Sequence, residues 1–330
     1  MPMKIMKQQL MDLLNIHSPS GEEKPVRDYL HPILEELMDN VYIDDYGNLL
    51  ATKVCGTGEG ATIMLSAHMD TVTSVLHTKS VVENGDIITA EENCTSTVLG
   101  ADDKAGIAIA LTVLRYIPDA FNGTIKIAFS KEEEIGCIGA DNIDVSFYDD
   151  VDLAIAIDRK GKRDIVVGHQ LAFCSDNVGV FVEQVSSLIK MDYKCVEGGV
   201  SDAMIFSGNG INSINLSAGY DNEHTNQEQV SFNAMIDTTN LIVHIIAQIN
   251  NYYIGFGSVP LYNKWVEDDM MLNEVDDSMW VEINDNNGDI FSYGVEGNIV
   301  IAQNGNHVRM DVNTIDELYD KIKDHMTGGV

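Results

Sequence analysis

The segment 61-ATIMLSAHMD-70 joins an apolar run to the first candidate site residues of the chain. The run, residues 61–65, leads directly to His68 and Asp70. A short apolar run with such an ending is typical of a buried parallel strand with a site at its carboxyl end. In extended backbone, residues two apart point to the same side, so Asp70 can accept a hydrogen bond from one ring nitrogen of His68 while the other binds a metal. Taken alone, the HxD pattern also arises by chance at strand ends.

Four further stretches repeat this arrangement, each with a histidine or a carboxylate just past an apolar run: residues 100–106, 131–136, 154–158 and 223–225. The pattern predicts strands at 62–65, 124–129, 153–157 and 211–216, and helices at 106–117, 176–188, 201–207 and 230–250. Alternating strands and helices favour an α/β fold with a mixed, largely parallel central sheet sandwiched by helices.

Smaller elements are predicted near the N-terminus. Helical spacing indicates helices at residues 4–16 and from Pro25 to about residue 38, with Ser20 and Glu23 forming a capping box between them. Hairpins are expected at residues 41–54 and around the tip Asn84-Gly85-Asp86.

The composition excludes several classes of function. The 330 residues include 52 acidic and 20 basic ones, a net charge of −32, and such a surface repels nucleic-acid backbones. No apolar run approaches the ~20 residues that a membrane span needs, and no signal peptide is expected. The five cysteines are an odd number without a CxxC pair, which favours a reducing, cytoplasmic location.

A boundary is predicted near residues 255–257. Residues 1–254 would form the catalytic domain, and residues 255–330 a small acidic α+β appendage of unknown role. The appendage carries 15 acidic and four basic residues. Its predicted elements are strands at 280–283 and 299–302 and a helix at 315–325.

The adjacent carboxylates Asp102 and Asp103 stand just before a predicted helix. One interpretation is an acidic helix cap, because a helix N-terminus stabilises anions. The other is that Asp102 bridges two metals, since a carboxylate has two oxygens and two-metal sites have spacings of about 3.5–4 Å.

Three consecutive glutamates, residues 132–134, follow the predicted strand 124–129. A run of acidic residues is usually a solvated face, but its place at a strand end favours a site. Neighbouring side chains diverge there, so Glu133 and Glu134 can differ in role, one binding a metal and the other taking a proton from water.

Two later candidates complete the set. Asp158 ends an apolar strand, and its burial requires either a cation or a partner such as Arg159 or Lys160. His224 lies in a loop beyond the strand 211–216, where a lone histidine is more often a surface residue. The combined order HxD…D…EE…D…H is far more specific than any of its parts.

These residues lie in four phrases, 18-SPSGEE-23, 66-SAHMDTV-72, 100-GADDKAG-106 and 133-EEIG-136. With them the chain, over about residues 4–250, resembles the co-catalytic dizinc peptidases, and within them the peptidase T / tripeptide aminopeptidase group. The resemblance implies the phosphorylase-like fold of zinc exopeptidases and a cis peptide after Asp102. It implies Asp102 as the bridging ligand, Glu133 as the general base and Asp70 as the residue that orients His68. The implied metal ligands are His68, Asp102, Glu134, Asp158 and His224.

One departure from the family pattern concerns its lid. Many relatives insert a dimerisation or lid domain before the last histidine ligand, whereas here Asp158 and His224 are only 66 residues apart. The lid is therefore expected to be missing, so that an oligomer would not form through it.

The sequence thus predicts a metallo-exopeptidase with two divalent metals, zinc or alternatively cobalt or manganese, that removes N-terminal residues from short peptides. Two alternatives stay open. One is a related amidohydrolase, namely a carboxypeptidase, a dipeptidase or an N-acyl amino acid deacylase. The other is a non-catalytic binding protein on the same fold.

Overall fold

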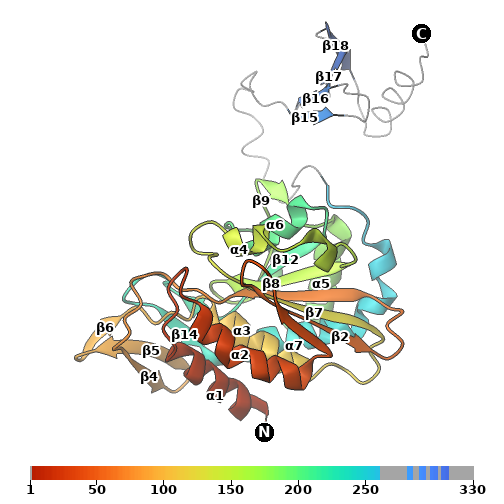
Figure 1. The fold of residues 1–330 in the computed structure, drawn as a ribbon. Coiled ribbons are helices and arrows are strands. Elements are labelled where there is room, and N and C mark those ends of the chain that lie inside the picture. Colours follow the sequence, from red (N-terminus) through yellow and green to blue (C-terminus); the bar gives the residue numbers. More distant parts are fainter. Residues whose placement is uncertain (1, 261–280, 285–289, 295–297, 304–305, 312–330) are drawn as a thin grey trace. The chain divides into compact units, whose positions relative to one another are not determined.

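The computed structural model describes residues 2–260, 281–284, 290–294, 298–303 and 306–311. The chain divides into two compact units, Met1–Val266 and Glu267–Val330. The first unit holds a layered α/β architecture (Figure 1). Among the described residues, no helix combines the length and the apolar character that crossing a membrane requires.

A nine-stranded mixed sheet forms the centre of the first unit. Its middle strands β7, β3, β8 and β12 pair in parallel, and β1, β2 and β10 pair antiparallel at the flanks. This confirms the predicted mixed sheet with a largely parallel middle. The strand order is β1 (Asn40–Ile43), β2 (Leu49–Cys55), β7 (Gly123–Ser130), β3 (Thr62–His68), β8 (Leu153–Arg159), β12 (Ser213–Ser217), β9 (Asp164–His169) and β10 (Leu171–Ala172), with β11 (Lys194–Glu197) paired to β9.

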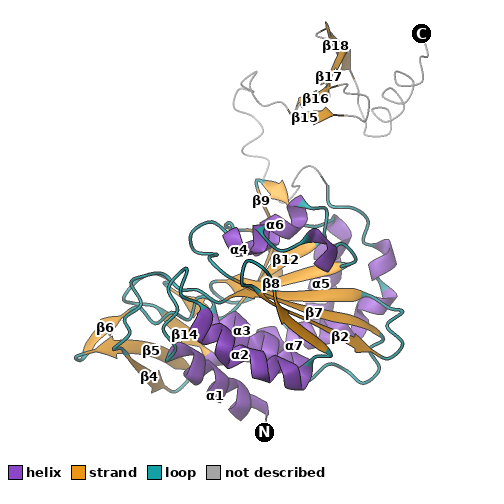
Figure 2. Ribbon diagram, in the orientation of Figure 1, coloured by secondary structure: helices purple, strands orange, loops and turns teal. Residues whose placement is uncertain are grey.

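Helices cover both faces of this sheet, with α3 and α7 on one side and α4 and α6 on the other (Figure 2). Strand β3 is buried along its whole length, as expected for a strand covered on both faces. Its side chains alternate: Ile63 and Leu65 join the core on the α3 side, and Met64 joins the core against α6. The helices are α1 (Pro2–Leu14), α2 (Lys24–Leu37), α3 (Lys104–Leu114), α4 (Ile138–Asp141), α5 (Asp176–Leu188), α6 (Asp202–Gly208) and α7 (Phe232–Gln248), with short 3-10 turns at Val145–Phe147, Ile249–Asn251 and Tyr253–Gly255.

Helix α3 is buried on all sides because it lies between the sheet and the helices α1 and α7. Its close approach to β8 depends on Gly106. A Cβ atom there would lie 2.1 Å from the carbonyl oxygen of Ile157 and 2.5 Å from the carboxylate of Asp103. Only glycine therefore allows α3 to begin where it does.

A second, smaller sheet lies beside the first, at the left of Figure 1. The tip Asn84-Gly85-Asp86 joins β4 to β5, as predicted, and the hairpin of β1 and β2 is also confirmed. Strand β14 pairs with β5, so the chain beyond β12 is tied to the segment between β3 and α3. This sheet consists of β13 (Tyr220–Asp221), β14 (Gln229–Ser231), β5 (Ile87–Glu92), β4 (Ser80–Asn84) and β6 (Thr95–Thr97).

The predicted capping box is wrong. Glu23 stands at the N-cap of α2 but makes no capping bond, and its carboxylate accepts the backbone N–H groups of Gly21 and Glu132. The hydroxyl of Ser20 donates instead to Asp70, 50 residues away. Ser20 and Glu23 therefore bond to Asp70 and Glu132, which are distant in the sequence, and do not form the predicted capping pair.

The second unit contains a four-stranded antiparallel sheet. The predicted strands at 280–283 and 299–302 correspond to β15 and β17 over the described residues, whereas the helix predicted at 315–325 lies outside them. The strands are β15 (Val281–Asn284), β16 (Ile290–Gly294), β17 (Asn298–Gln303) and β18 (Asn306–Asp311).

Candidate metal centre

The candidate residues gather at the carboxyl ends of the parallel strands. His68 is the last residue of β3, Asp158 is the penultimate residue of β8, and Glu133 follows the end of β7 by three positions. Because β7, β3 and β8 are neighbours that run in the same direction, their ends meet at one edge of the sheet. Sequence positions far apart are thereby brought within a few ångströms.

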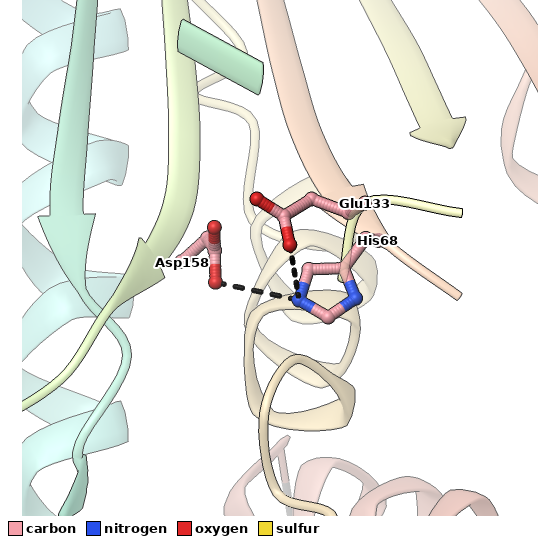
Figure 3. Close-up of side chains that lie close together, drawn as sticks. All are labelled: His68, Glu133 and Asp158. Atoms are coloured by element: carbon pink, nitrogen blue, oxygen red, sulfur yellow. Dashed lines mark ion pairs between the residues drawn. The ribbon is translucent and has the colours of Figure 1, made fainter. Parts of the chain in front are cut away.

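His68 is 1% exposed and faces carboxylates on both sides of its ring. Its Nε2 lies 3.0 Å from Oδ1 of Asp102, 3.5 Å from Oδ1 of Asp158 and 3.9 Å from Oε2 of Glu133. Figure 3 shows the last two of these contacts. On the other side, Nδ1 lies 3.3 Å from Oδ1 of Asp70 and 3.1 Å from the backbone oxygen of that residue. Asp70 therefore holds one nitrogen and leaves the other directed into the acidic cluster.

Asp70 also organises the loop that follows β7. Its Oδ1 accepts the backbone N–H of Glu133 at 3.0 Å, and its Oδ2 accepts the N–H of Glu134 at 3.2 Å and the hydroxyl of Ser20 at 2.7 Å. Burial by itself would raise the pKa of Asp70, but His68 and these donors hold it below its ordinary value. The ionised carboxylate fixes both the histidine ring and the two glutamates.

Asp102 lies between the two histidines. Its Oδ1 faces Nε2 of His68 at 3.0 Å, and its Oδ2 faces Nε2 of His224 at 3.2 Å. The same nitrogen of His224 lies 2.9 Å from Oε2 of Glu134. Each oxygen of one carboxylate is thus directed at a different imidazole.

Asp103 takes the other role considered for the acidic pair. It is the N-cap of α3, and its Oδ1 accepts the N–H of Gly106 at 3.0 Å. The peptide bond between Asp102 and Asp103 is cis, in agreement with the resemblance. The helix-cap interpretation therefore holds for Asp103, and the bridging role of Asp102 stays a prediction.

The cluster carries an excess of negative charge. Burial, assisted by the charge of Asp158, raises the pKa of Glu133 to about 9, and burial raises the pKa of Asp158 to about 7. Hydrogen bonds to Asp102 and Glu134 raise the pKa of His224 to about 10. Buried carboxylates without a compensating cation are costly, so the group favours the binding of positive charge.

Neighbouring basic residues do not supply that charge. Arg159 pairs with Asp164 at 3.0 Å, and Lys160 pairs with Glu223 at 2.7 Å. Among the residues described, no lysine or arginine forms an ion pair with Asp158 or Asp102. Asp158 faces His68 and Tyr220 instead of the two basic residues considered for it.

The donor set suits divalent metals. Among the described residues, four groups of side chains have ligand atoms within 4.8 Å of one another. Two of these groups contain His68, one with Glu133 and Asp158 and the other with Asp102 and Glu134. Imidazole nitrogen combined with carboxylate oxygen suits zinc, and cobalt or manganese would also be accepted.

Several supporting residues were not predicted from the sequence. The Tyr220 hydroxyl donates to Oδ1 of Asp158 at 2.9 Å, and the side chain of Asn215 bonds both the N–H and the carbonyl oxygen of that residue. Asp202 is buried near Glu133 and accepts the hydroxyl hydrogen bond of Ser130. No distinct signal identified Asn215, because the predicted strand 211–216 also contains the polar residues Asn212 and Ser213.

Known proteins resemble this chain in sequence and in fold. A family model described as M42 glutamyl aminopeptidase matches residues 77–241, half of the chain. The matched range includes Asp102, Glu133, Asp158 and His224, whereas His68 precedes it.

A curated relative, peptidase T of Clostridium botulinum (strain 657 / Type Ba4), is 30% identical over 203 residues, which cover 48% of this chain and 49% of that protein. The chain spans about half the length, or less, of the curated relatives it matches.

Two solved structures share the fold. The aminopeptidase PepT from Bacillus cereus ATCC 10987 has a TM-score of 0.67 at 19% identity, covering 75% of this chain and 98% of that one. The TET1 peptidase of Pyrococcus horikoshii has a TM-score of 0.60 at 18% identity, covering 73% and 99%. At these identities the likeness concerns the fold, and it agrees with the predicted architecture.

Proposed function

The chain belongs to the M42 glutamyl aminopeptidase family, and from this premise we propose that it is a metal-dependent aminopeptidase that acts on short peptides. The observation that carries the proposal is the position of Asp102, with one oxygen directed at His68 and the other at His224. A carboxylate in that position is suited to hold two cations side by side.

The proposed ligands divide into two sets that share Asp102. His68, Asp102 and Asp158 would hold one cation, and Asp102, Glu134 and His224 would hold the other. When bound, such cations lower the pKa of water and polarise the carbonyl oxygen of a peptide bond. Zinc is the proposed native metal, because the ligands combine nitrogen and oxygen donors.

Glu133 is the proposed general base. It is close to the cluster but is not needed to complete either ligand set, and its carboxylate is only partly exposed. Glu133 would take a proton from the attacking water as the new C–O bond forms. It would then give that proton to the amine nitrogen as the C–N bond breaks, which balances the hydrolysis. Asp70 acts beside it as the residue that orients the His68 ring.

Short peptides with a free N-terminus are the proposed substrates. A curated relative is named peptidase T and a structural relative aminopeptidase PepT, and short peptides with a free N-terminus are proposed by analogy. The net charge of −32 is compatible with a substrate that carries an α-ammonium group.

A panel of free and N-acetylated tripeptides tests the proposal. Hydrolysis is expected only of the free peptides, is expected to stop with a chelator, and is expected to return when zinc, cobalt or manganese is added. Preference for the acetylated peptides would instead indicate an N-acyl deacylase. Chelator-resistant hydrolysis would contradict a metal mechanism altogether.

An oligomeric assembly and a cytoplasmic location are also proposed for this chain. The TET1 structure of Pyrococcus horikoshii is described as assembling into a tetrahedron or a large octahedral shell, and an oligomer is proposed here by analogy. The segment between Asp158 and His224 contributes β9, α5, α6 and β12 to the layered core, so the contact would involve other surfaces than a lid. The five cysteines all lie in the described part of the chain and form no disulfide there, in keeping with a reducing cytoplasm.

A further inference from the structure

Glu228 is a buried carboxylate that none of the roles above uses. It is 1% exposed, yet its oxygens accept three consecutive backbone N–H groups of another loop. Its Oε2 accepts Gly100 N–H at 2.7 Å, and its Oε1 accepts the N–H groups of Ala101 at 2.6 Å and Asp102 at 3.2 Å. The last of these donors belongs to the carboxylate residue that lies between the two histidines.

Glu228 also belongs to the loop that carries His224. This loop leaves β13 after Asp221 and enters β14 at Gln229, immediately after Glu228. Inside it, Glu228 N–H donates to the Thr225 carbonyl oxygen at 3.1 Å, and the Thr225 hydroxyl donates to the Asn222 carbonyl oxygen at 2.7 Å. The loop is thus a compact turn, with its second end secured by the pairing of β14 with β5.

The backbone of residues 100–102 is shaped to meet a carboxylate. Gly100 has φ +71°, a conformation that other residues rarely adopt, and a Cβ there would approach Val75 and Thr71 at 3.1–3.3 Å. Three donors directed at two oxygens need an acceptor-only group. A carboxylate meets that need, whereas an amide would direct its own N–H₂ at a backbone N–H.

We propose that Glu228 is a positioning residue that fixes the distance between Asp102 and His224 and so sets the affinity of the cation site formed by Asp102, Glu134 and His224. The Glu228 side chain holds together the loops that carry Asp102 and His224, two of the three proposed ligands of this site. The site formed by His68, Asp102 and Asp158 depends less on it, because β3 and β8 hold His68 and Asp158 directly. This inference rests on the proposed two-cation function.

The test compares Glu228→Gln and Glu228→Asp with the wild-type protein. Glu223→Gln serves as the control, because it removes a carboxylate from the same loop that, within the described part of the chain, forms an ion pair with Lys160 and not with the histidines. Zinc bound per chain is measured during titration of chelator-treated protein, and the absorption spectrum of the cobalt form is recorded. Thermal unfolding in chelator measures any loss that is merely structural.

The wild type and Glu223→Gln are expected to bind two cations. Glu228→Gln is expected to bind the first normally and the second about 10–100-fold more weakly, with an altered cobalt spectrum and activity restored by excess zinc. Glu228→Asp keeps the charge on a shorter side chain, so its affinity for the second cation is expected to lie between those of the wild type and Glu228→Gln. If Glu228→Gln does not fold, the comparison of Glu228→Asp with the wild type tests the inference.

Two results would overturn the inference in different ways. Variants that bind both cations with wild-type affinity, or that weaken both equally, would refute the role of Glu228 and leave the proposed function standing. A wild-type protein that binds fewer than two cations would refute both.

Discussion

The Oδ1 atom of Asp70 lies 3.3 Å from Nδ1 of His68, on the side of the ring that faces away from the acidic cluster. The two residues are separated by a single position in the chain, and both are buried. This contact defines which ring nitrogen is available, and it does so through a carboxylate that also fixes the loop of Glu133.

Replacement of Asp70 by asparagine is therefore expected to weaken the centre without removing a ligand. An amide group cannot accept from the ring and from two backbone N–H groups as a carboxylate does. We expect metal affinity and kcat/KM to fall by about 10–100-fold, measured by zinc titration and peptide hydrolysis. Ser20→Ala, which removes only one of the donors to Asp70, serves as the control and is expected to have a smaller effect. Wild-type affinity in Asp70→Asn would exclude the orienting role.

Glu133→Gln is expected to separate catalysis from metal binding. The amide cannot take a proton from water, so kcat should fall by about 10²–10⁴-fold while two cations remain bound. The neighbouring Glu132→Gln is a matched control, because Glu132 bonds Tyr46 and Lys131 and not the histidines. The role assigned to Glu133 would be untenable if its variant kept full peptidase activity with both cations in place.

The two histidines are expected to respond differently to replacement by alanine. His68→Ala removes a side chain that is 1% exposed from among four carboxylates, so both metal binding and folding stability should fall. His224 is 45% exposed, so His224→Ala should lose one cation and should destabilise the metal-free protein less than His68→Ala does. Some loss of stability is expected, because Asp102 and Glu134 lose their imidazole partner. Metal content per chain and thermal unfolding in chelator measure the two effects.

The surface residue His244, on α7, supplies the control for both variants. Two cations bound at wild-type affinity in His68→Ala would show that the ligand assignment is wrong.

The stability of chelator-treated protein is expected to fall as the pH rises. Burial and the charge of Asp158 raise the pKa of Glu133 from 4.5 to about 9, so the folded state binds more protons than the unfolded state between these values. The free energy of unfolding then decreases with pH across that window. Urea unfolding at pH 5, 7 and 8.5 should show this decrease in the wild type and a smaller one in Glu133→Gln. Parallel curves for the two proteins would contradict the assignment of the titration to Glu133.

Part of the candidate centre was predictable because residues such as Asp102 and Asp158 follow strong local signals, whereas His224 lies in a loop without one. An apolar run that ends at Asp158, or a small-residue turn that contains Asp102, identifies a strand end or a helix start without reference to any partner. The capping box of Ser20 and Glu23 failed for the opposite reason. A local rule was applied to side chains whose partners, Asp70 and the N–H of Glu132, lie far away in the sequence.

The sequence by itself determined which positions carry a histidine or a carboxylate at the end of an apolar strand, and parallel strands direct their carboxyl ends to one edge of a sheet. Only the tertiary structure decided how they meet: which oxygen of Asp102 faces which histidine, and that Glu228 holds the Gly100–Asp102 backbone. Those contacts join segments more than 30 and more than 120 residues apart. Their geometry depends on the packing of whole strands and loops, which no local pattern of residues encodes.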